Sequence, residues 1–85
     1  MEKELESPYK VMYYVHDIYS NIDSYPKTKY EQILLKEEAI TRAKNLLKQL
    51  KNYFYKIQKE YTYDITTMVI NYQNELVEEF KWIGN

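Results

Sequence analysis

Apolar residues between Ile33 and Tyr61 recur at helical spacing. They fall at Ile33, Ile40, Ala43, Leu47, Leu50, Phe54, Ile57 and Tyr61. From Ile40 onward the steps alternate between three and four residues, which places these side chains on one face of an α-helix. Thr28 and Glu31 have the spacing of a capping box, and residues 27–83 contain neither Gly nor Pro. This pattern predicts a long central helix over residues 29–60.

A shorter helix is predicted before it, over residues 8–23. Its apolar side chains recur at spacings of four, three and four: Val11, Val15, Ile18 and Ile22. Ser7 and Pro8 are typical of the first positions of a helix. Asp23 to Lys27 is predicted to be a turn, because the residue before Pro26 is sterically excluded from the helical region.

A last helix is predicted over residues 64–83, with Asp64 as its N-cap and Gly84 as its stop. Its apolar stripe is Ile65, Met68 or Val69, Tyr72, Leu76, Phe80 and Ile83. The β-branched cluster between Thr62 and Ile70 would also suit a strand. Its alternation is poor, however, and a lone strand would have no partner, so the helix is favoured.

These elements predict one domain over residues 1–85: an all-α, antiparallel bundle of three or four helices with a long central helix. Whether the bundle has three or four helices depends on whether the central helix breaks near residues 51–53. A break would let it fold back into a four-helix monomer. A straight helix would have each half covered on one side only, so it favours self-association. Good helix formers from Ala39 to Lys51 favour the straight helix.

The composition excludes several kinds of functional site. The chain has no Cys, a single His (His16) and a single Gly, so thiolate metal sites, nucleophile–histidine triads and glycine-rich phosphate loops are not expected. Glu75, Glu78 and Glu79 are interpreted as a solvated cluster. We expect no enzyme, no cofactor and no metal. The acidic N-terminus and the absence of a long apolar run predict a cytoplasmic protein with no transmembrane segment.

Basic residues are concentrated between positions 41 and 60, a segment that contains six of them and only one acidic residue. The whole chain has a net charge of −1. One predicted helical face forms the candidate binding face: Lys44, Lys48, Lys51, Tyr55 and Lys59. An acidic protein or the anionic head groups of a membrane surface would suit it. Nucleic acid is disfavoured, because strong binders carry a larger basic excess.

Two stretches give the chain a resemblance to the enterocin A immunity-like family of bacteriocin immunity proteins: residues 15–22, VHDIYSNI, and residues 72–84, YQNELVEEFKWIG. Residues 34–50 are similar in character to the second helix of that family. The resemblance implies a cytoplasmic four-helix bundle without enzymatic activity. It also implies protection of a producing bacterium through a membrane sugar-transporter receptor that the bacteriocin has engaged, with specificity in the C-terminal helix.

The sequence thus predicts a small, non-enzymatic helical module that binds a protein. The alternative to an immunity protein is an inhibitor or regulator encoded by a phage, a plasmid or an archaeal virus, which would bind a host protein. A regulator that contacts nucleic acid through the basic face is a third class.

Overall fold

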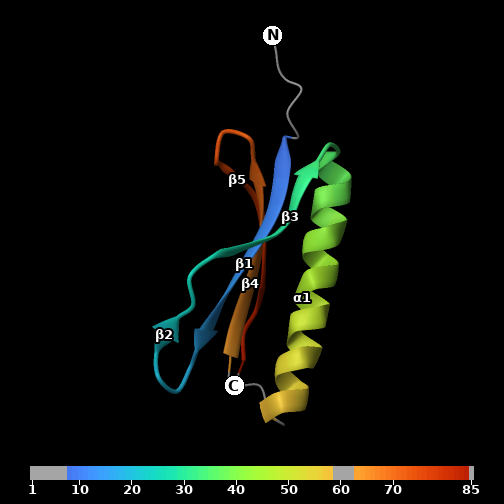
Figure 1. Cartoon of the computed structure of the whole chain (residues 1–85). Coiled ribbons are helices and arrows are strands. Elements are labelled where there is room, and N and C mark those ends of the chain that lie inside the picture. The colour runs from blue at the N-terminus through green and yellow to red at the C-terminus, as the bar shows by residue number, and fades with distance from the viewer. Residues whose placement is uncertain (1–7, 59–62, 85) are drawn as a thin grey trace.

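The protein consists of one helix packed on one face of a five-stranded antiparallel sheet (Figure 1). The computed structural model describes residues 8–58 and 63–84. In chain order, the elements are β1 Tyr9–Asp17, β2 Ile22–Asp23, β3 Lys27–Ile33, α1 Lys36–Gln58, β4 Tyr63–Asn71 and β5 Leu76–Trp82. The predicted all-α bundle of three or four helices is therefore wrong, and the fold is α+β.

The centre of the sheet is the pair β1 and β4. Their register runs without a shift from Tyr9↔Asn71 to Asp17↔Tyr63. β5 pairs with the other edge of β4, whereas β3 and the short β2 pair with the other edge of β1. Because β1 is antiparallel to both β3 and β4, these two strands run in the same direction. The helix α1 connects them, crossing over β1.

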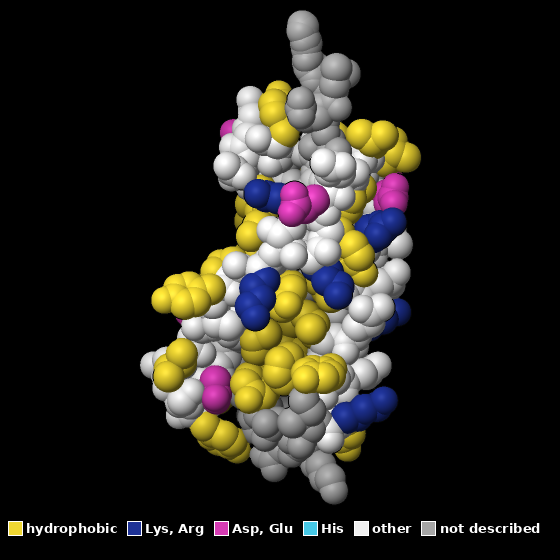
Figure 2. Space-filling model, in the orientation of Figure 1, with side chains coloured by type: hydrophobic (Ala, Val, Ile, Leu, Met, Phe, Trp, Pro, Cys, Tyr) yellow, Lys and Arg dark blue, Asp and Glu magenta, His cyan; other side chains and the backbone are white. Residues whose placement is uncertain are grey.

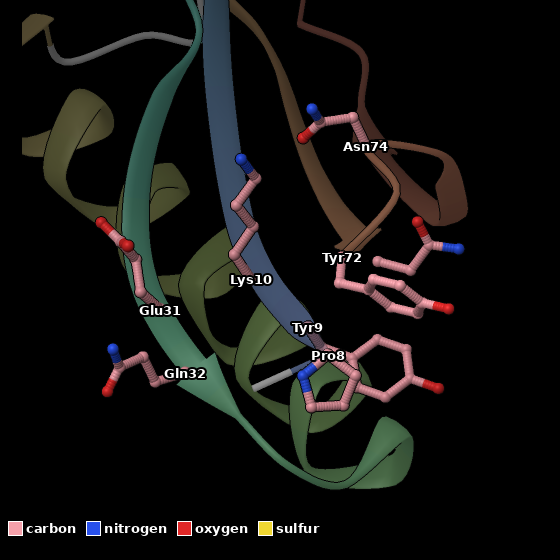
Figure 3. A pocket seen from close by; sticks show the side chains of 8 residues that line it. Pro8, Tyr9, Lys10, Glu31, Gln32, Tyr72 and Asn74 are labelled. Atoms are coloured by element: carbon pink, nitrogen blue, oxygen red, sulfur yellow. The ribbon is translucent and has the colours of Figure 1, made fainter. Parts of the chain in front are cut away.

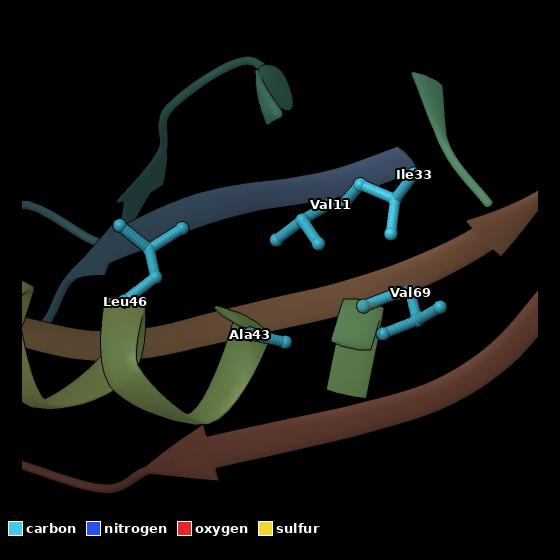
Figure 4. Close-up of a cluster of buried hydrophobic side chains, with 6 residues drawn as sticks. Val11, Ile33, Ala43, Leu46 and Val69 are labelled. Carbon is cyan, nitrogen blue, oxygen red and sulfur yellow. The ribbon is translucent and has the colours of Figure 1, made fainter. Parts of the chain in front are cut away.

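The core lies between α1 and the two central strands (Figure 4). The helix contributes Ala39, Ala43 and Leu46, the central strands contribute Val11 and Val69, and the outer strand β3 adds Ile33. Thr67 of β4 is also fully buried, and its hydroxyl donates a hydrogen bond to the carbonyl oxygen of Ala43 at 3.0 Å. A buried hydroxyl without a partner would be costly, so this bond keeps a polar side chain compatible with the core.

The central helix is confirmed in part. It begins at Lys36 instead of Lys29, because residues 27–33 form β3, and the predicted capping box of Thr28 and Glu31 lies within that strand. It continues unbroken through residues 51–53. Leu46 is buried where the predicted stripe had Leu47. Glu37 and Glu38 lie in the first turn, where carboxylates oppose the positive end of the helix dipole.

The helices predicted over residues 8–23 and 64–83 are wrong, because a spacing of four residues fits both helix and strand. Val11 and Val15 lie one helical turn apart, but they are also two strand periods apart. In the structure they point to the same side of β1 and toward α1. Asp64 is not an N-cap, since it accepts a hydrogen bond from the backbone N–H of Gly84 at 2.8 Å.

The connections between strands use residues in the left-handed backbone region. Asn21 has a φ of 58° after β1, and Asn74 has a φ of 64° between β4 and β5. Asn tolerates this region better than most residues, which suits both turns. Gln32 adopts a φ of 62° within β3, where the register with β1 shifts. The predicted turn over Asp23 to Lys27 does contain a connection, but it joins β2 to β3.

Replacing Leu46 with Ala should lower the free energy of unfolding by about 2–5 kcal/mol, because Leu46 is 3% exposed and its removal leaves a cavity. Urea denaturation followed by circular dichroism measures the change. Leu34→Ala is the control, since Leu34 is 66% exposed and should change the stability little. Equal losses for the two variants would contradict the assignment of the core.

Candidate functional site

A groove opens beside the C-terminal half of α1, because β3 packs on the helix only toward its own C-terminal end. Ile33 belongs to the buried core, whereas β2 and the start of β3 lie away from the helix (Figure 1). Within the part of the chain that the structure describes, no third element covers these portions of β1 and α1. The groove between them has a volume of about 620 Å³.

Aromatic and aliphatic side chains line most of this groove, which we call the tyrosine groove. Its apolar lining is Tyr13, Val15, Ile22, Leu50, Tyr53, Phe54 and Tyr63. Figure 2 shows the continuous hydrophobic surface beside the helix, in the lower half of the view.

The aromatic side chains of the groove contact one another. Phe54 meets Tyr53 edge to face, with ring centroids 5.3 Å apart, and lies 4.6 Å from the ring of Tyr63. Such contacts hold the rings in place and leave less freedom to be lost on binding. Tyr53 and Ile22 remain 57% and 63% exposed. The groove therefore offers apolar surface that residues 8–58 and 63–84 leave uncovered.

Polar residues form the rim, and several of them are engaged in holding the β1–β2 turn. The hydroxyl oxygen of Ser24 accepts a hydrogen bond from the N–H of Val15, and the N–H of Ser24 donates one to the carbonyl of Val15. Asp23 lies 2.7 Å from Nδ1 of His16. Since Ser24 satisfies the backbone of Val15 here, a ligand in the groove would be recognised by side chains.

Asp17 places a carboxylate on the same rim. Its Oδ1 accepts hydrogen bonds from the backbone N–H groups of Ser20 at 3.3 Å and Tyr19 at 3.1 Å. The N–H of Ser20 is the largest cause that lowers the pKa of Asp17 below its ordinary value of 3.8, and it outweighs the opposing effect of desolvation. This carboxylate is therefore ionised at neutral pH.

The Ser24 hydroxyl and the Asp23 carboxylate on the rim are both engaged by other groups of the chain. The oxygen of Ser24 is already bonded to the backbone, and His16 is paired with Asp23. Within residues 8–58 and 63–84, no three His, Cys, Asp or Glu side chains are placed to hold a metal ion. What the arrangement offers is an apolar contact surface with charged groups at its border.

The candidate binding face named from the sequence lies on the other side of α1, toward β5. Lys44, Lys48, Lys51 and Tyr55 follow one another at spacings of four, three and four, so they share one side of the observed helix. Lys59 lies outside the described residues.

Two of these lysines cover aromatic rings of β5. Nζ of Lys44 lies 5.6 Å from the centroid of Phe80, and Nζ of Lys51 lies 4.0 Å from that of Trp82. Their stems shield the edge of the core while their ammonium groups stay near the surface.

The sequence interpretation missed the tyrosine groove, because its residues come from two predicted helices and from the connections predicted after each of them. The high content of tyrosine, with eleven residues, was the available signal. It indicated aromatic surface without saying which tyrosines would meet. Only the pairing of β1 with β4 brings Tyr13 and Tyr63 to the same side of the sheet as Tyr53.

A second hollow, at the opposite end of the sheet, is less suited to binding (Figure 3). It measures about 250 Å³ and includes Tyr9, Lys10, Glu31, Gln32 and Asn74. The labelled polar side chains spread outward from different strands and do not converge on one point. A specific ligand site needs convergent polar groups, so the tyrosine groove is the stronger candidate.

Substituting Asn for Asp17 should make the stability less dependent on pH in the acidic range. Asn can accept the same N–H bonds but carries no charge. The folded protein favours the ionised form of Asp17, so its contribution is full above the unfolded pKa near 3.8 and is lost as the pH falls through the lower folded pKa. Urea titrations at neutral pH and at pH values below 3.8 should show the wild type's advantage shrinking. An advantage that stays constant with pH would contradict this.

Comparisons with known proteins give no relative for this chain: no family model, no curated protein and no solved structure matches it. Among the described residues, no helix has both the length and the apolar character needed to cross a membrane.

Proposed function

We propose that this protein is a non-enzymatic binding module that receives an apolar segment of another protein in the tyrosine groove. The observation that carries the proposal is the groove itself, an opening of about 620 Å³ lined by four aromatic and three aliphatic side chains. Tyrosine is enriched at protein interfaces, because it supplies a large contact area and a polar hydroxyl while losing little conformational freedom.

The openness of the groove favours a polypeptide over a small molecule. Sites for small molecules enclose most of the ligand surface. Here Tyr53 and Ile22 are more than half exposed, and Tyr19 and Tyr25 on the neighbouring hairpin are 75% and 87% exposed. A partner that covers these side chains as well as the groove would bury far more surface than a compact ligand.

The rim favours a basic residue beside the apolar anchor of the partner. Asp17 carries a negative charge next to the groove, and the same rim holds Asp23 and one lysine, Lys27, so carboxylates outnumber ammonium groups there. Carboxylates at the edge of an interface favour a partner with Lys or Arg at that position. They also oppose a phosphate backbone, so this surface supports a protein partner over nucleic acid.

The resemblance to bacteriocin immunity proteins does not contribute to this proposal. It assumed helices over both similar stretches, but residues 15–22 contain the end of β1, a turn and the start of β2. Residues 72–84 contain a turn and β5. A four-helix framework for that activity is therefore missing. Binding of a cellular protein, as in the inhibitor alternative, needs only the tyrosine groove and its rim.

A peptide library displayed on phage tests the groove and does not require its natural partner to be identified. Peptides selected on the wild type should combine an aromatic or aliphatic anchor with a basic residue. Tyr53→Asp and Ile22→Asp should each weaken their binding about tenfold or more, which corresponds to roughly 1.4 kcal/mol, because a carboxylate would be desolvated in the apolar contact.

The matched control is Tyr72→Asp, since Tyr72 is 69% exposed and lines the hollow at the other end of the sheet. It should leave the selected peptides bound as tightly as before. Peptides that lose no affinity with either groove variant, or that lose as much with the control, would contradict a binding role for the groove.

A further inference from the structure

β5 is an edge strand whose outer side carries no further strand in the described part of the chain. It pairs with β4 from Ile70↔Leu76 to Ile65↔Trp82, and it ends the strand order of the sheet. An edge strand presents backbone N–H and C=O groups that another extended chain can bond. β5 contains no Pro, and its one register shift lies near its start, which leaves Glu79 to Trp82 regularly paired.

A ridge of three lysines overhangs this edge from the helix. We define the lysine ridge as Lys44, Lys48 and Lys51. The ammonium groups of Lys44 and Lys51 lie over the rings of Phe80 and Trp82, two side chains on the face of β5 that is turned toward the helix, a face that Glu78 shares. Lys48 is exposed and lies one turn from each of the others.

The charge of the ridge is not balanced by carboxylates of its own helix. α1 has Glu37 and Glu38 in its first turn, and Glu38 is paired with Arg42 at 2.9 Å. The remainder of α1, residues 39–58, contains no Asp or Glu. Among the described residues, the three ridge lysines form no ion pair.

We propose that an extended acidic segment of another protein adds to the free edge of β5 as a further strand, with its helix-facing carboxylates bound to the lysine ridge. An added strand would lie about 4.8 Å beyond β5, and its side chains on one face would recur about every 6.8 Å. Glu or Asp at alternate positions would therefore reach the ridge, while the backbone bonds β5.

A second copy of this chain suits the edge less well. Antiparallel pairing of β5 with itself about a two-fold axis would place both helices on the same face of a joined sheet. The two lysine ridges would then face each other across the seam. Like charges held close together are destabilising, so the ridge favours a foreign acidic strand over self-pairing.

Nucleic acid also suits this edge less well. A peptide strand would use the backbone groups of β5, which a nucleic acid does not need. This inference concerns a surface on the opposite side of α1 from the tyrosine groove, so it does not depend on the proposed function.

The test uses the soluble peptide acetyl-Thr-Glu-Val-Glu-Val-Glu-Thr-amide and nuclear magnetic resonance of the isotopically labelled full chain. Binding should shift the β5 amide signals and slow their hydrogen exchange. Changing Lys44, Lys48 and Lys51 together to Gln should weaken binding about tenfold or more. Gln keeps part of each stem over the rings, and circular dichroism checks that the variant is folded.

The matched control changes Lys27, Lys29 and Lys36 to Gln, which removes the same charge from β3 and the start of α1 and should leave the affinity unchanged. Two control peptides separate the contributions. In the first, lysine replaces each glutamate, and charge repulsion from the lysine ridge should abolish binding. In the second, alternate backbone amides of the acidic peptide are N-methylated, and the loss of hydrogen bonds to β5 should abolish binding.

Three outcomes would overturn the proposal. The first is no shift of β5 signals at millimolar peptide, and the second is undiminished binding of the N-methylated peptide. The third is a ridge-dependent complex with oligothymidylate, or a dimer by sedimentation, in the absence of peptide binding. Tyr53→Asp should leave the acidic peptide bound, so failure here is distinguishable from failure of the tyrosine groove.

Discussion

The ladder between β1 and β4 is the interaction on which the other elements depend. Both strands carry fully buried side chains toward the helix, including Val11 from β1 and Ile65 and Val69 from β4. β3 pairs only with β1, and β5 pairs only with β4, so each outer strand has its place because the central pair exists. An isolated pair of strands is marginally stable in water, and α1 supplies the apolar layer that makes the ladder stable.

One helix can cover only part of the sheet, and this limit creates both candidate binding surfaces. The register shifts between β1 and β3, together with the left-handed backbone of Gln32, are of the kind that bends an edge strand. β2 and the start of β3 therefore lie away from α1, and the side chains of Tyr13 and Val15 of β1 line the groove on this side of the helix. On its other side, the helix reaches over β5 with lysine stems. The two sides therefore differ in chemistry: one is apolar, with two carboxylates and one lysine at its border, and the other is basic.

The sequence was sufficient to predict a long central helix, but insufficient to predict where it begins or that a sheet covers it. Ala39, Ala43 and Leu46 are separated by steps of four and three, and a step of three cannot keep side chains on one face of a strand. In β1 and β4 the buried pairs are Val11 with Val15 and Ile65 with Val69, and their spacing of four fits either structure. The β-branched residues of β4 favoured a strand locally, but the partner that makes the strand possible lies at the other end of the chain.

The separation of the paired strands along the sequence also explains why the candidate site could be predicted only in part. Lys44, Lys48, Lys51 and Tyr55 belong to one helix, so their common side follows from local spacing alone. The tyrosine groove combines β1, the β2 hairpin, α1 and the start of β4. Its assembly depends on pairings between remote segments, for which a single sequence has no local signal. The contact of Lys51 with Trp82 likewise requires β5 to lie beside the helix.

The order of the elements along the chain has a consequence for synthesis on the ribosome. β1 and α1 emerge before β4, yet the apolar side chains of both are buried against β4. Helical structure forms locally and quickly, whereas closing the long loop between β1 and β4 carries an entropic cost. The nascent chain would therefore carry a formed but uncovered helix until residues 63–71 leave the exit tunnel. During that interval its stripe of Ala39, Ala43 and Leu46 lacks the strand that completes the buried core in the folded protein.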